Sequence, residues 1–94
     1  MLFALICHDR PNQLQLRLSV RPDHLAYLTA HADQIVYAGP LLDEAEGTPN
    51  GSLLILDVPD RASAEAFASG DPYALAGLFR DVHIVPTKQV FPTG

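Results

Sequence analysis

Hydrophobic and polar positions divide the chain into alternating strand and helix segments. Residues 2–8 form a continuous apolar run that ends at a cluster of turn-forming residues, a pattern typical of a strand buried on both faces. Leucines then recur at helical spacing and predict one helix over about residues 12–31, with Asn12 as its N-cap. Pro22 lies within this pattern, so we expect it to kink or interrupt the helix. The leucines that form the apolar face of this helix are Leu14, Leu18, Leu25 and Leu28.

The centre of the chain predicts two more strands separated by a polar loop. Residues 34–42 are rich in β-branched and aromatic side chains, and Gly39-Pro40 within them indicates a bulge or an early end. Residues 43–50 are polar and rich in turn formers, which is typical of a solvated loop. Residues 51–58 are again apolar and predict the third strand.

Two helical segments follow the third strand. Residues 61–69 are alanine-rich and predict a helix, with Asp60 or Ser63 as its cap. Residues 71–77 predict a further helical turn that is capped by Asp71.

Residues 79–91 complete the chain as a long strand, and Pro86 places that strand at an edge of the sheet or at a bulge. The resulting order, β-α-β-β-α-β, is that of the ferredoxin-like α+β fold, a four-stranded antiparallel sheet with two helices on one face. We expect residues 1–94 to form a single domain, because a chain of this length has room for only one.

The helices can cover only one face of this sheet, yet its strands are apolar on both. An open sheet face of this kind is rarely left in water, so we expect a homodimer packed sheet to sheet. The alternative is a single domain whose open face is kept for another protein. The first strand has Phe3, Leu5 and Cys7 on one face and Leu2, Ala4 and Ile6 on the other.

The composition argues against several classes of partner. Six basic residues against eleven acidic ones give a net charge of -5, which argues against a nucleic-acid partner. No apolar run is long enough to span a membrane. The single cysteine, Cys7, cannot form an internal disulfide and fits a reducing cytosol, so we expect a cytoplasmic protein.

A polar seam on the first helix carries the strongest candidate for chemistry. It consists of Arg17, Arg21, His24 and His31, which share one side of the helix. Imidazole is the usual general acid or base near neutral pH, and His24 lies at the border of the apolar face, where it can line a cleft. The alternative is that His24 is a border residue whose ring bonds a backbone carbonyl.

Asp71 and Ser52 are candidates to assist this histidine. A carboxylate on one ring nitrogen fixes the imidazole tautomer, although N-capping alone also explains an aspartate at position 71. Ser52 opens a strand and can donate a hydrogen bond to a bound anion, or it is simply a polar strand-end residue. No Gly-x-Ser-x-Gly motif surrounds Ser52, so we do not expect a serine nucleophile.

Other reactive side chains are expected to be structural. Cys7 lies in an apolar strand and is expected to be a small buried hydrophobic residue. Judged alone, Tyr73 is expected to be a packing residue rather than an acid. His8, His31 and His83 are scattered along the chain without the spacing of a metal motif. We expect no metal ion and no cofactor, although a site made of histidine and aspartate stays possible without a spacing motif.

Short motifs in a particular order cover nearly the whole chain. After a strand that ends in a short polar turn, they are R-x-x-H-L at 21–25, A-G-P at 38–40, G-S at 51–52, D-P-Y at 71–73, A-G at 76–77 and V-F at 90–91. Together, their order and spacing resemble the YciI-like (YCII-related) family. The resemblance implies a ferredoxin-like protomer that forms a dimeric α/β barrel.

The resemblance also implies a functional site. It pairs His24 with Asp71 and matches the family's serine to Ser52. One branch of the family is similar to dehydrochlorinases that act on chlorinated hydroxyhydroquinones, whereas most members have no assigned reaction. The residues expected to bind the substrate beside this pair are Arg21, Gly39, Pro40 and Tyr73.

We therefore expect a small cofactor-independent lyase or isomerase, in which His24 transfers a proton on a small anionic or aromatic metabolite. One alternative is a non-catalytic dimer that binds or senses a metabolite in the same pocket. Another is a metal-assisted lyase with His24 and Asp71 as ligands.

Overall fold

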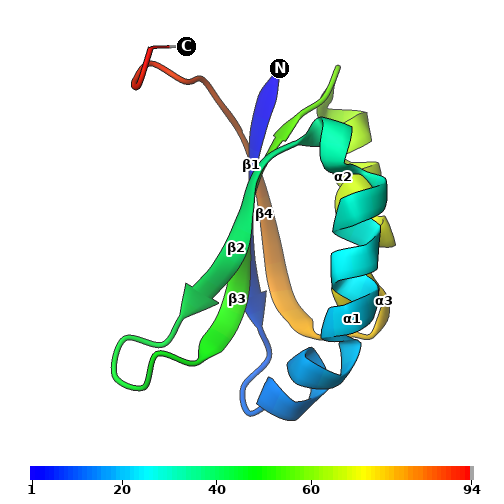
Figure 1. Cartoon of the computed structure of the whole chain (residues 1–94), viewed down its shortest axis with the longest axis vertical. Helices are drawn as coiled ribbons and strands as arrows, with labels where there is room; N and C mark the ends of the chain where they lie inside the picture. Colours follow the sequence, from blue (N-terminus) through cyan, green and yellow to red (C-terminus); the bar gives the residue numbers. More distant parts are fainter. Residues whose placement is uncertain (94) are drawn as a thin grey trace.

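The computed structural model describes residues 1–93, which form an antiparallel sheet covered on one face by helices (Figure 1). The strands are β1 (Leu2–Asp9), β2 (Ile35–Leu42), β3 (Pro49–Asp57) and β4 (Phe79–Thr87). The helices are α1 (Leu14–Ala30), the 3-10 helix η1 (Ala32–Gln34), α2 (Arg61–Gly70) and α3 (Pro72–Leu75). The strand order is β2-β3-β1-β4, and every neighbouring pair is antiparallel. The predicted ferredoxin-like α+β fold is confirmed.

Aspartates cap both helices of the second half, and of the two caps predicted for α2, Asp60 rather than Ser63 takes the position. Oδ1 of Asp60 accepts a hydrogen bond from the backbone N–H of Ser63 at 2.8 Å and caps α2. Asp71 caps α3 by accepting from the backbone N–H of Tyr73 at 2.9 Å, and Pro72 occupies the first helical turn, where its missing N–H costs little.

Helix α1 starts later and is more continuous than predicted. Asn12 is not its N-cap: it has a φ of 62°, a left-handed conformation that asparagine tolerates, and Gln13 takes the cap position without a side-chain hydrogen bond. Pro22 lies inside an unbroken helix rather than at an interruption. The missing N–H of Pro22 costs one helical hydrogen bond. We attribute the continuity of α1 to its packing against α3 and to the contact of Tyr27 and Leu28 with the core.

The buried face of α1 is polar, which corrects the predicted apolar face. Leu18 and Leu25 are 48% and 41% exposed, whereas Arg17 and His24 are buried. Leu28 alone of the predicted leucines packs against the core. Charged partners elsewhere in the chain make this burial possible, and helical spacing within one segment cannot reveal them.

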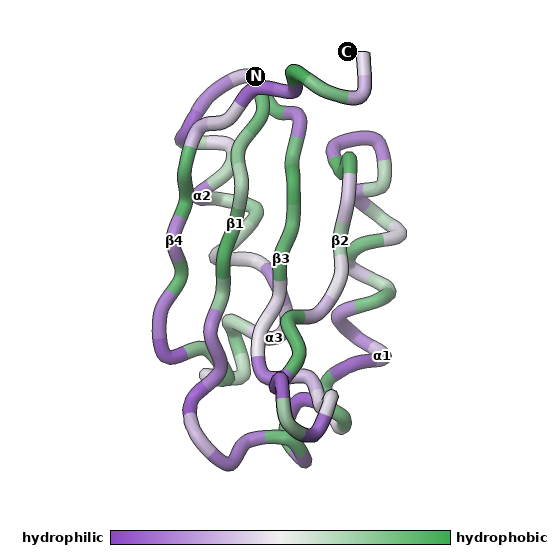
Figure 2. Tube along the Cα trace, turned by 90° about the vertical axis from the view of Figure 1, so that its left-hand side faces the viewer, coloured by the Kyte–Doolittle hydropathy of each residue, from purple (hydrophilic) through white to green (hydrophobic). Residues whose placement is uncertain are grey.

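The hydrophobic core lies between the sheet and the helices. From the strands it contains Phe3, Leu5, Cys7, Leu54 and Leu56, all nearly inaccessible to solvent. The opposite side of β1 and β3, here called the open face, consists of Leu2, Ala4, Ile6, Leu53 and Ile55, which are only half-buried. Burial of β1 on both sides is therefore not achieved within one chain. Figure 2 views the open face and shows hydrophobic residues along β1 and β3.

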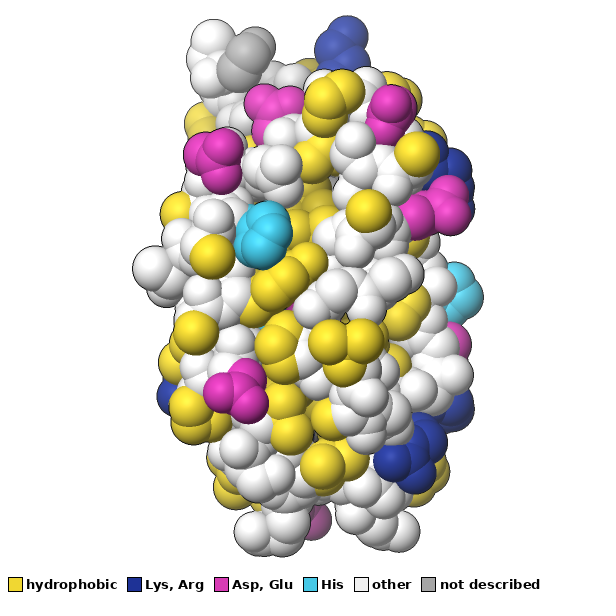
Figure 3. Space-filling model, turned by 90° about the vertical axis from the view of Figure 1, so that its right-hand side faces the viewer, with side chains coloured by type: hydrophobic (Ala, Val, Ile, Leu, Met, Phe, Trp, Pro, Cys, Tyr) yellow, Lys and Arg dark blue, Asp and Glu magenta, His cyan; other side chains and the backbone are white. Residues whose placement is uncertain are grey.

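The helical side of the molecule has a different surface. Apolar side chains gather in a band down its middle, with charged side chains toward the margins (Figure 3). Beneath this surface, α1 and α2 are linked by the hydroxyl of Tyr27, which donates to the carbonyl of Phe67 at 2.9 Å. None of the helices described for residues 1–93 is both long and apolar enough to cross a membrane.

Strands β2 and β4 are the sheet edges, which explains the prolines within them. Pro40 does not end β2, which continues to Leu42. The register of β2 against β3 shifts between Leu41 and Leu42, so the predicted irregularity falls one residue after Pro40. Pro86 lies in an edge strand, as the sequence indicated. That strand ends at Thr87 rather than at residue 91.

Candidate active site

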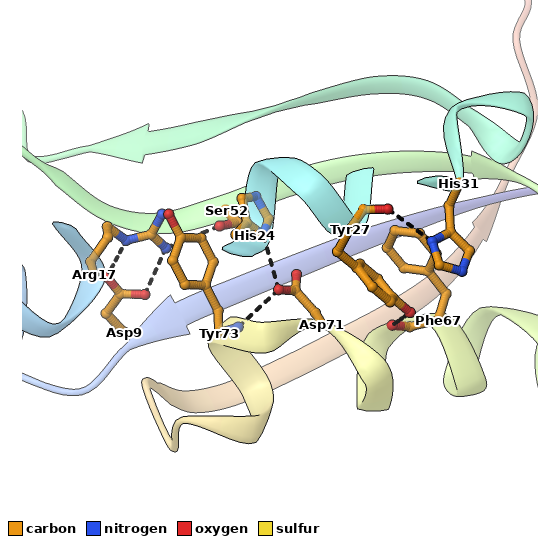
Figure 4. A network of polar contacts seen from close by, with 9 residues as sticks. All are labelled: Asp9, Arg17, His24, Tyr27, His31, Ser52, Phe67, Asp71 and Tyr73. Atoms are coloured by element: carbon orange, nitrogen blue, oxygen red, sulfur yellow. Dashed lines mark hydrogen bonds and ion pairs between the residues drawn. The ribbon is translucent and has the colours of Figure 1, made fainter. Parts of the chain in front are cut away.

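A cluster of buried polar side chains lies on the helical side of the sheet (Figure 4). Its members come from β1, α1, β3 and the start of α3: Asp9, Arg17, His24, Ser52 and Asp71. Within the described residues, every buried side-chain nitrogen or oxygen has a hydrogen-bond partner. Burying ionic groups is costly unless they are paired, so this cluster is held in one arrangement by its own contacts.

His24 and Asp71 are in direct contact. Nδ1 of His24 lies 2.9 Å from Oδ1 of Asp71, and their side chains are only 10% and 4% exposed. The same carboxylate oxygen caps α3, so the capping role and the histidine contact, which the sequence left as alternatives, occur together. Because a carboxylate only accepts hydrogen bonds, Nδ1 carries the proton and Nε2 is the nitrogen free to accept one.

Tyr73 fixes the plane of the His24 ring. The two rings stack with centroids 4.0 Å apart and an angle of 19° between their planes. The guanidinium carbon of Arg17 lies 4.4 Å from the centroid of the Tyr73 ring, within cation–π range. Burial raises the pKa of Tyr73 above its ordinary value, so its phenol stays protonated at neutral pH.

Arg17 joins the histidine side of the cluster to β1 and β3. Its Nε and Nη2 donate to the two carboxylate oxygens of Asp9 at 2.7 and 2.9 Å, and Nη2 also donates to Oγ of Ser52 at 3.0 Å. Burial alone would lower the pKa of Arg17, but the bonds and charge of Asp9 raise it above its usual range, so the guanidinium stays charged. Since Ser52 accepts from Arg17, its own hydroxyl proton is free to donate elsewhere.

Gly51 allows β3 to bring Ser52 close to β1. A Cβ atom at position 51 would lie 2.4 Å from the backbone oxygen of Cys7, a distance that side-chain carbons do not adopt. Only glycine fits here, and the G-S pair in the sequence therefore has a steric cause. Ser52 pairs with Cys7 across the β1–β3 ladder and points to the helical side.

A pocket of about 210 Å³ opens beside His24, between α1 and strands β2 and β3. Its wall includes all four residues predicted to bind substrate, together with the histidine and the serine: Arg21, Gly39, Pro40, Tyr73, His24 and Ser52. Asp71 does not line the pocket and stands behind the histidine. With Nδ1 of His24 held by Asp71, we take Nε2 as the ring nitrogen available to a pocket ligand.

The comparison with protein families agrees with the motif order. The model described as the YCII-related domain matches residues 1–88. The chain belongs to the YCII-related family. Protein YciI from Escherichia coli O6:H1 (strain CFT073) is 36% identical over 98 residues, which cover 97% of this chain and 100% of that protein.

Solved structures with a similar fold extend this result. The 5-chloro-2-hydroxyhydroquinone dehydrochlorinase TftG from Burkholderia phenoliruptrix AC1100, in complex with 2,5-dihydroxybenzoquinone, superposes with a TM-score of 0.90 at 33% identity. The match covers 95% of each chain. A crystal structure of an antibiotic biosynthesis monooxygenase, at 16% identity and a TM-score of 0.57, covers 96% of this chain and 99% of its own and shows the shared fold alone.

Two members of this YCII-related site were not assigned from the sequence. Arg17 was placed on the polar seam without a role, and Asp9 was one of the turn-forming residues after the apolar run 2–8, yet they form a buried ion pair beside Ser52. The usable signal was the seam itself, because Arg17 lies seven residues, or about two helical turns, before His24. No signal marked Asp9, whose pairing depends on how β1 lies against α1.

The structure agrees with the prediction for Cys7, whereas two of the three remaining histidines are not scattered as expected. Burial, followed by the charge of Asp71, raises the pKa of Cys7 from 9.0 to about 12, so the thiol is inert at neutral pH, in line with its predicted packing role. His8 and His83, expected to be scattered, are brought together by the β1–β4 pairing. His31 remains apart, and its Nδ1 donates to the carbonyl of Tyr27 at 2.8 Å.

Proposed function

We propose that this YCII-related protein is a cofactor-independent enzyme in which His24 transfers a proton to or from a small phenolic or enolic substrate. The observation that carries the proposal is the orientation of one ring. Nδ1 of His24 is held by Asp71, and the same ring borders a pocket of a size suited to a small metabolite. A buried histidine–carboxylate pair beside a pocket is a candidate for general acid–base chemistry.

The proposed step begins with Nε2 of His24 as the general base. It removes a proton from a hydroxyl or an acidic carbon of the substrate, and the bond electrons left behind expel a leaving group from the ring or shift a double bond. Asp71 stabilises the imidazolium that forms and holds its tautomer. The proton is then returned to solvent or to the product from the same nitrogen.

Charge in the pocket favours an anionic substrate. Arg21 lines the pocket and makes no ion pair with any described residue, so its guanidinium is available to an oxyanion. The free hydroxyl proton of Ser52 supplies a second donor nearby. An apolar cavity of roughly 150 Å³ is enough to hold benzene, so this pocket has room for a single substituted ring. The similarity to a dehydrochlorinase of hydroxyhydroquinones supports this substrate class.

The proposed enzyme is a homodimer packed through the open face. Contact of these half-buried aliphatic side chains with water is unfavourable. A second copy of the chain, packed on the same surface, would remove them from solvent. Val36 and Tyr37 at the edge of the sheet are also more than half exposed and would extend the buried area. This dimer leaves the helical side, and so the cluster around His24, accessible.

The test compares the chain with its His24→Ala variant on hydroxyhydroquinones with and without a ring chlorine. We expect chloride release from the chlorinated compound by the unmodified chain, and a rate lower by roughly 10²–10⁴-fold in the variant. His31→Ala is the matched control, because it removes the histidine that directly follows α1 and is absent from the pocket lining. Turnover that survives His24→Ala would rule out the proposal. Binding without turnover of any tested ring would instead indicate a metabolite-binding dimer.

A further inference from the structure

A second polar cluster, which contains two histidines, lies on the opposite side of the sheet from His24. Strand pairing places His8 of β1 directly across from Asp81 of β4, and His83 follows two residues later on the same face of β4. Nδ1 of His8 lies 2.8 Å from Oδ1 of Asp81, and Nε2 of His83 lies 3.4 Å from the same oxygen. The three side chains thus converge around one carboxylate oxygen.

We propose that His8, Asp81 and His83 form a binding site for Zn²⁺ or a closely related divalent transition-metal ion. One ligand atom from each of the three residues lies within 4.8 Å of the others. Two ligands of a tetrahedral zinc ion, each about 2.0–2.1 Å from the metal, are roughly 3.3 Å apart. Two of the observed separations, 2.8 and 3.4 Å, bracket this value, and the third, between the two histidines, is no more than 4.8 Å. Rearrangement of the side chains alone can therefore bring the three ligand atoms around one ion.

The donor set selects the class of metal. Two imidazole nitrogens and one carboxylate oxygen suit zinc and its neighbours in the first transition row, whereas magnesium and calcium prefer oxygen ligands throughout. Three protein ligands also leave a fourth tetrahedral position for a water molecule.

Neighbouring charge supports the geometry of the carboxylate. Nε of Arg80 donates to Oδ2 of Asp81 at 3.0 Å, whereas both histidine contacts are to Oδ1, so Oδ1 is left for the metal. Partners of this kind commonly orient metal ligands. In the single chain the side chains of His8, Asp81 and His83 are 41%, 34% and 61% exposed, so an ion can reach them there. Because His83 pairs with Ile6 of the open face, the cluster lies on the side of the sheet that the proposed dimer covers.

The site would tie an edge strand to the centre of the sheet. His8 belongs to a central strand and the other two ligands to the edge strand β4, close to the register shift between His8 and Asp9. Metal binding to the folded chain alone would raise its thermal stability with increasing metal concentration. This function is independent of the pocket at His24, which lies across the sheet.

Calorimetric titration of the metal-free full chain with Zn²⁺ tests the proposal, with Mg²⁺ as the comparison ion. We expect one zinc ion per chain, no measurable magnesium binding, and an affinity at least tenfold weaker in His8→Gln and in His83→Gln. The matched control, His31→Gln, should bind zinc as the unmodified chain does, since it removes a histidine outside the cluster. Cobalt(II) bound to the same chain should give the visible absorption of a tetrahedral site, and this absorption should disappear in His83→Gln.

Three results would overturn the proposal. The first is the absence of stoichiometric zinc binding to the unmodified chain. The second is zinc binding that is unchanged in both cluster variants. The third is binding lost in His24→Gln but kept in His8→Gln and His83→Gln, which would place the metal in the pocket instead. Circular dichroism of each variant checks that loss of binding does not arise from loss of fold.

Discussion

His24 donates its Nδ1 proton to the one oxygen of Asp71 that also caps α3. A single carboxylate thus starts a helix and orients a ring that borders the pocket. Substitutions at position 71 can separate these two roles, because asparagine caps helices about as well as aspartate but carries no charge.

Asp71→Asn should keep the fold and reduce the proposed activity. We expect a free energy of unfolding within about 1 kcal/mol of the unmodified chain, since the cap is retained. The catalytic rate should fall by roughly 10²-fold or more, because a neutral amide does not stabilise the imidazolium. Asp71→Ala is the comparison, and it should lower both quantities. Equal rates for Asp71→Asn and the unmodified chain would show that the charge has no part in the reaction.

Arg17→Met should strongly destabilise the chain. The substitution leaves the carboxylate of Asp9 buried and unpaired, a change that typically costs about 3–5 kcal/mol. The double variant Asp9→Leu/Arg17→Met removes both charges and should recover much of this loss in urea unfolding. Glu65→Gln serves as the control, because it breaks an exposed ion pair with Arg61 that is worth at most about 1 kcal/mol.

Alkaline pH should destabilise the protein through Cys7. The folded-state pKa of about 12 exceeds the ordinary value of 9.0, so the unfolded chain loses this proton first as the pH rises. The stabilising contribution is complete below pH 9 and is lost between pH 9 and about 12, with a slope of at most about 1.4 kcal/mol per pH unit. Urea unfolding at several pH values should show a shallower decline for Cys7→Ala. Identical slopes for the two chains would contradict the assignment.

Ile55→Glu should prevent the proposed dimer. A buried unpaired carboxylate in the centre of the open face opposes association, so sedimentation should give a monomer where the unmodified chain gives a dimer. Leu75→Glu is the matched control, because Leu75 is 74% exposed on α3, away from the open face. A monomeric unmodified chain at micromolar concentration would contradict the dimer itself.

The sequence predicted the order of elements well because each had a local cause. Asp60 and Asp71 are followed by residues whose backbone N–H groups they cap, and Pro86 is tolerated only at an edge. The errors lie in α1, where Leu18 and Leu25 suggested the buried face. Burial of Arg17 and His24 instead depends on carboxylates of β1 and α3, which no pattern within the helix encodes.

The candidate site was predictable only where its residues lie in sequence motifs. His24, Ser52 and Asp71 were found because they lie in ordered motifs, and they do lie together. Asp9 was missed because its role depends on a contact between segments. The cluster of His8 with His83 was missed for a similar reason, since only the register of β1 against β4 brings them side by side.

The loop between β2 and β3 divides the residues of the candidate site between two segments of the chain. His24 and Arg17 precede this loop, whereas Ser52, Asp71 and Tyr73 follow it. Proteolytic cleavage at the exposed residues around Gly47 would thus yield two peptides, neither of which holds both His24 and Asp71. Recovery of activity on mixing the peptides would report their reassociation, so this loop is a natural position for a split reporter.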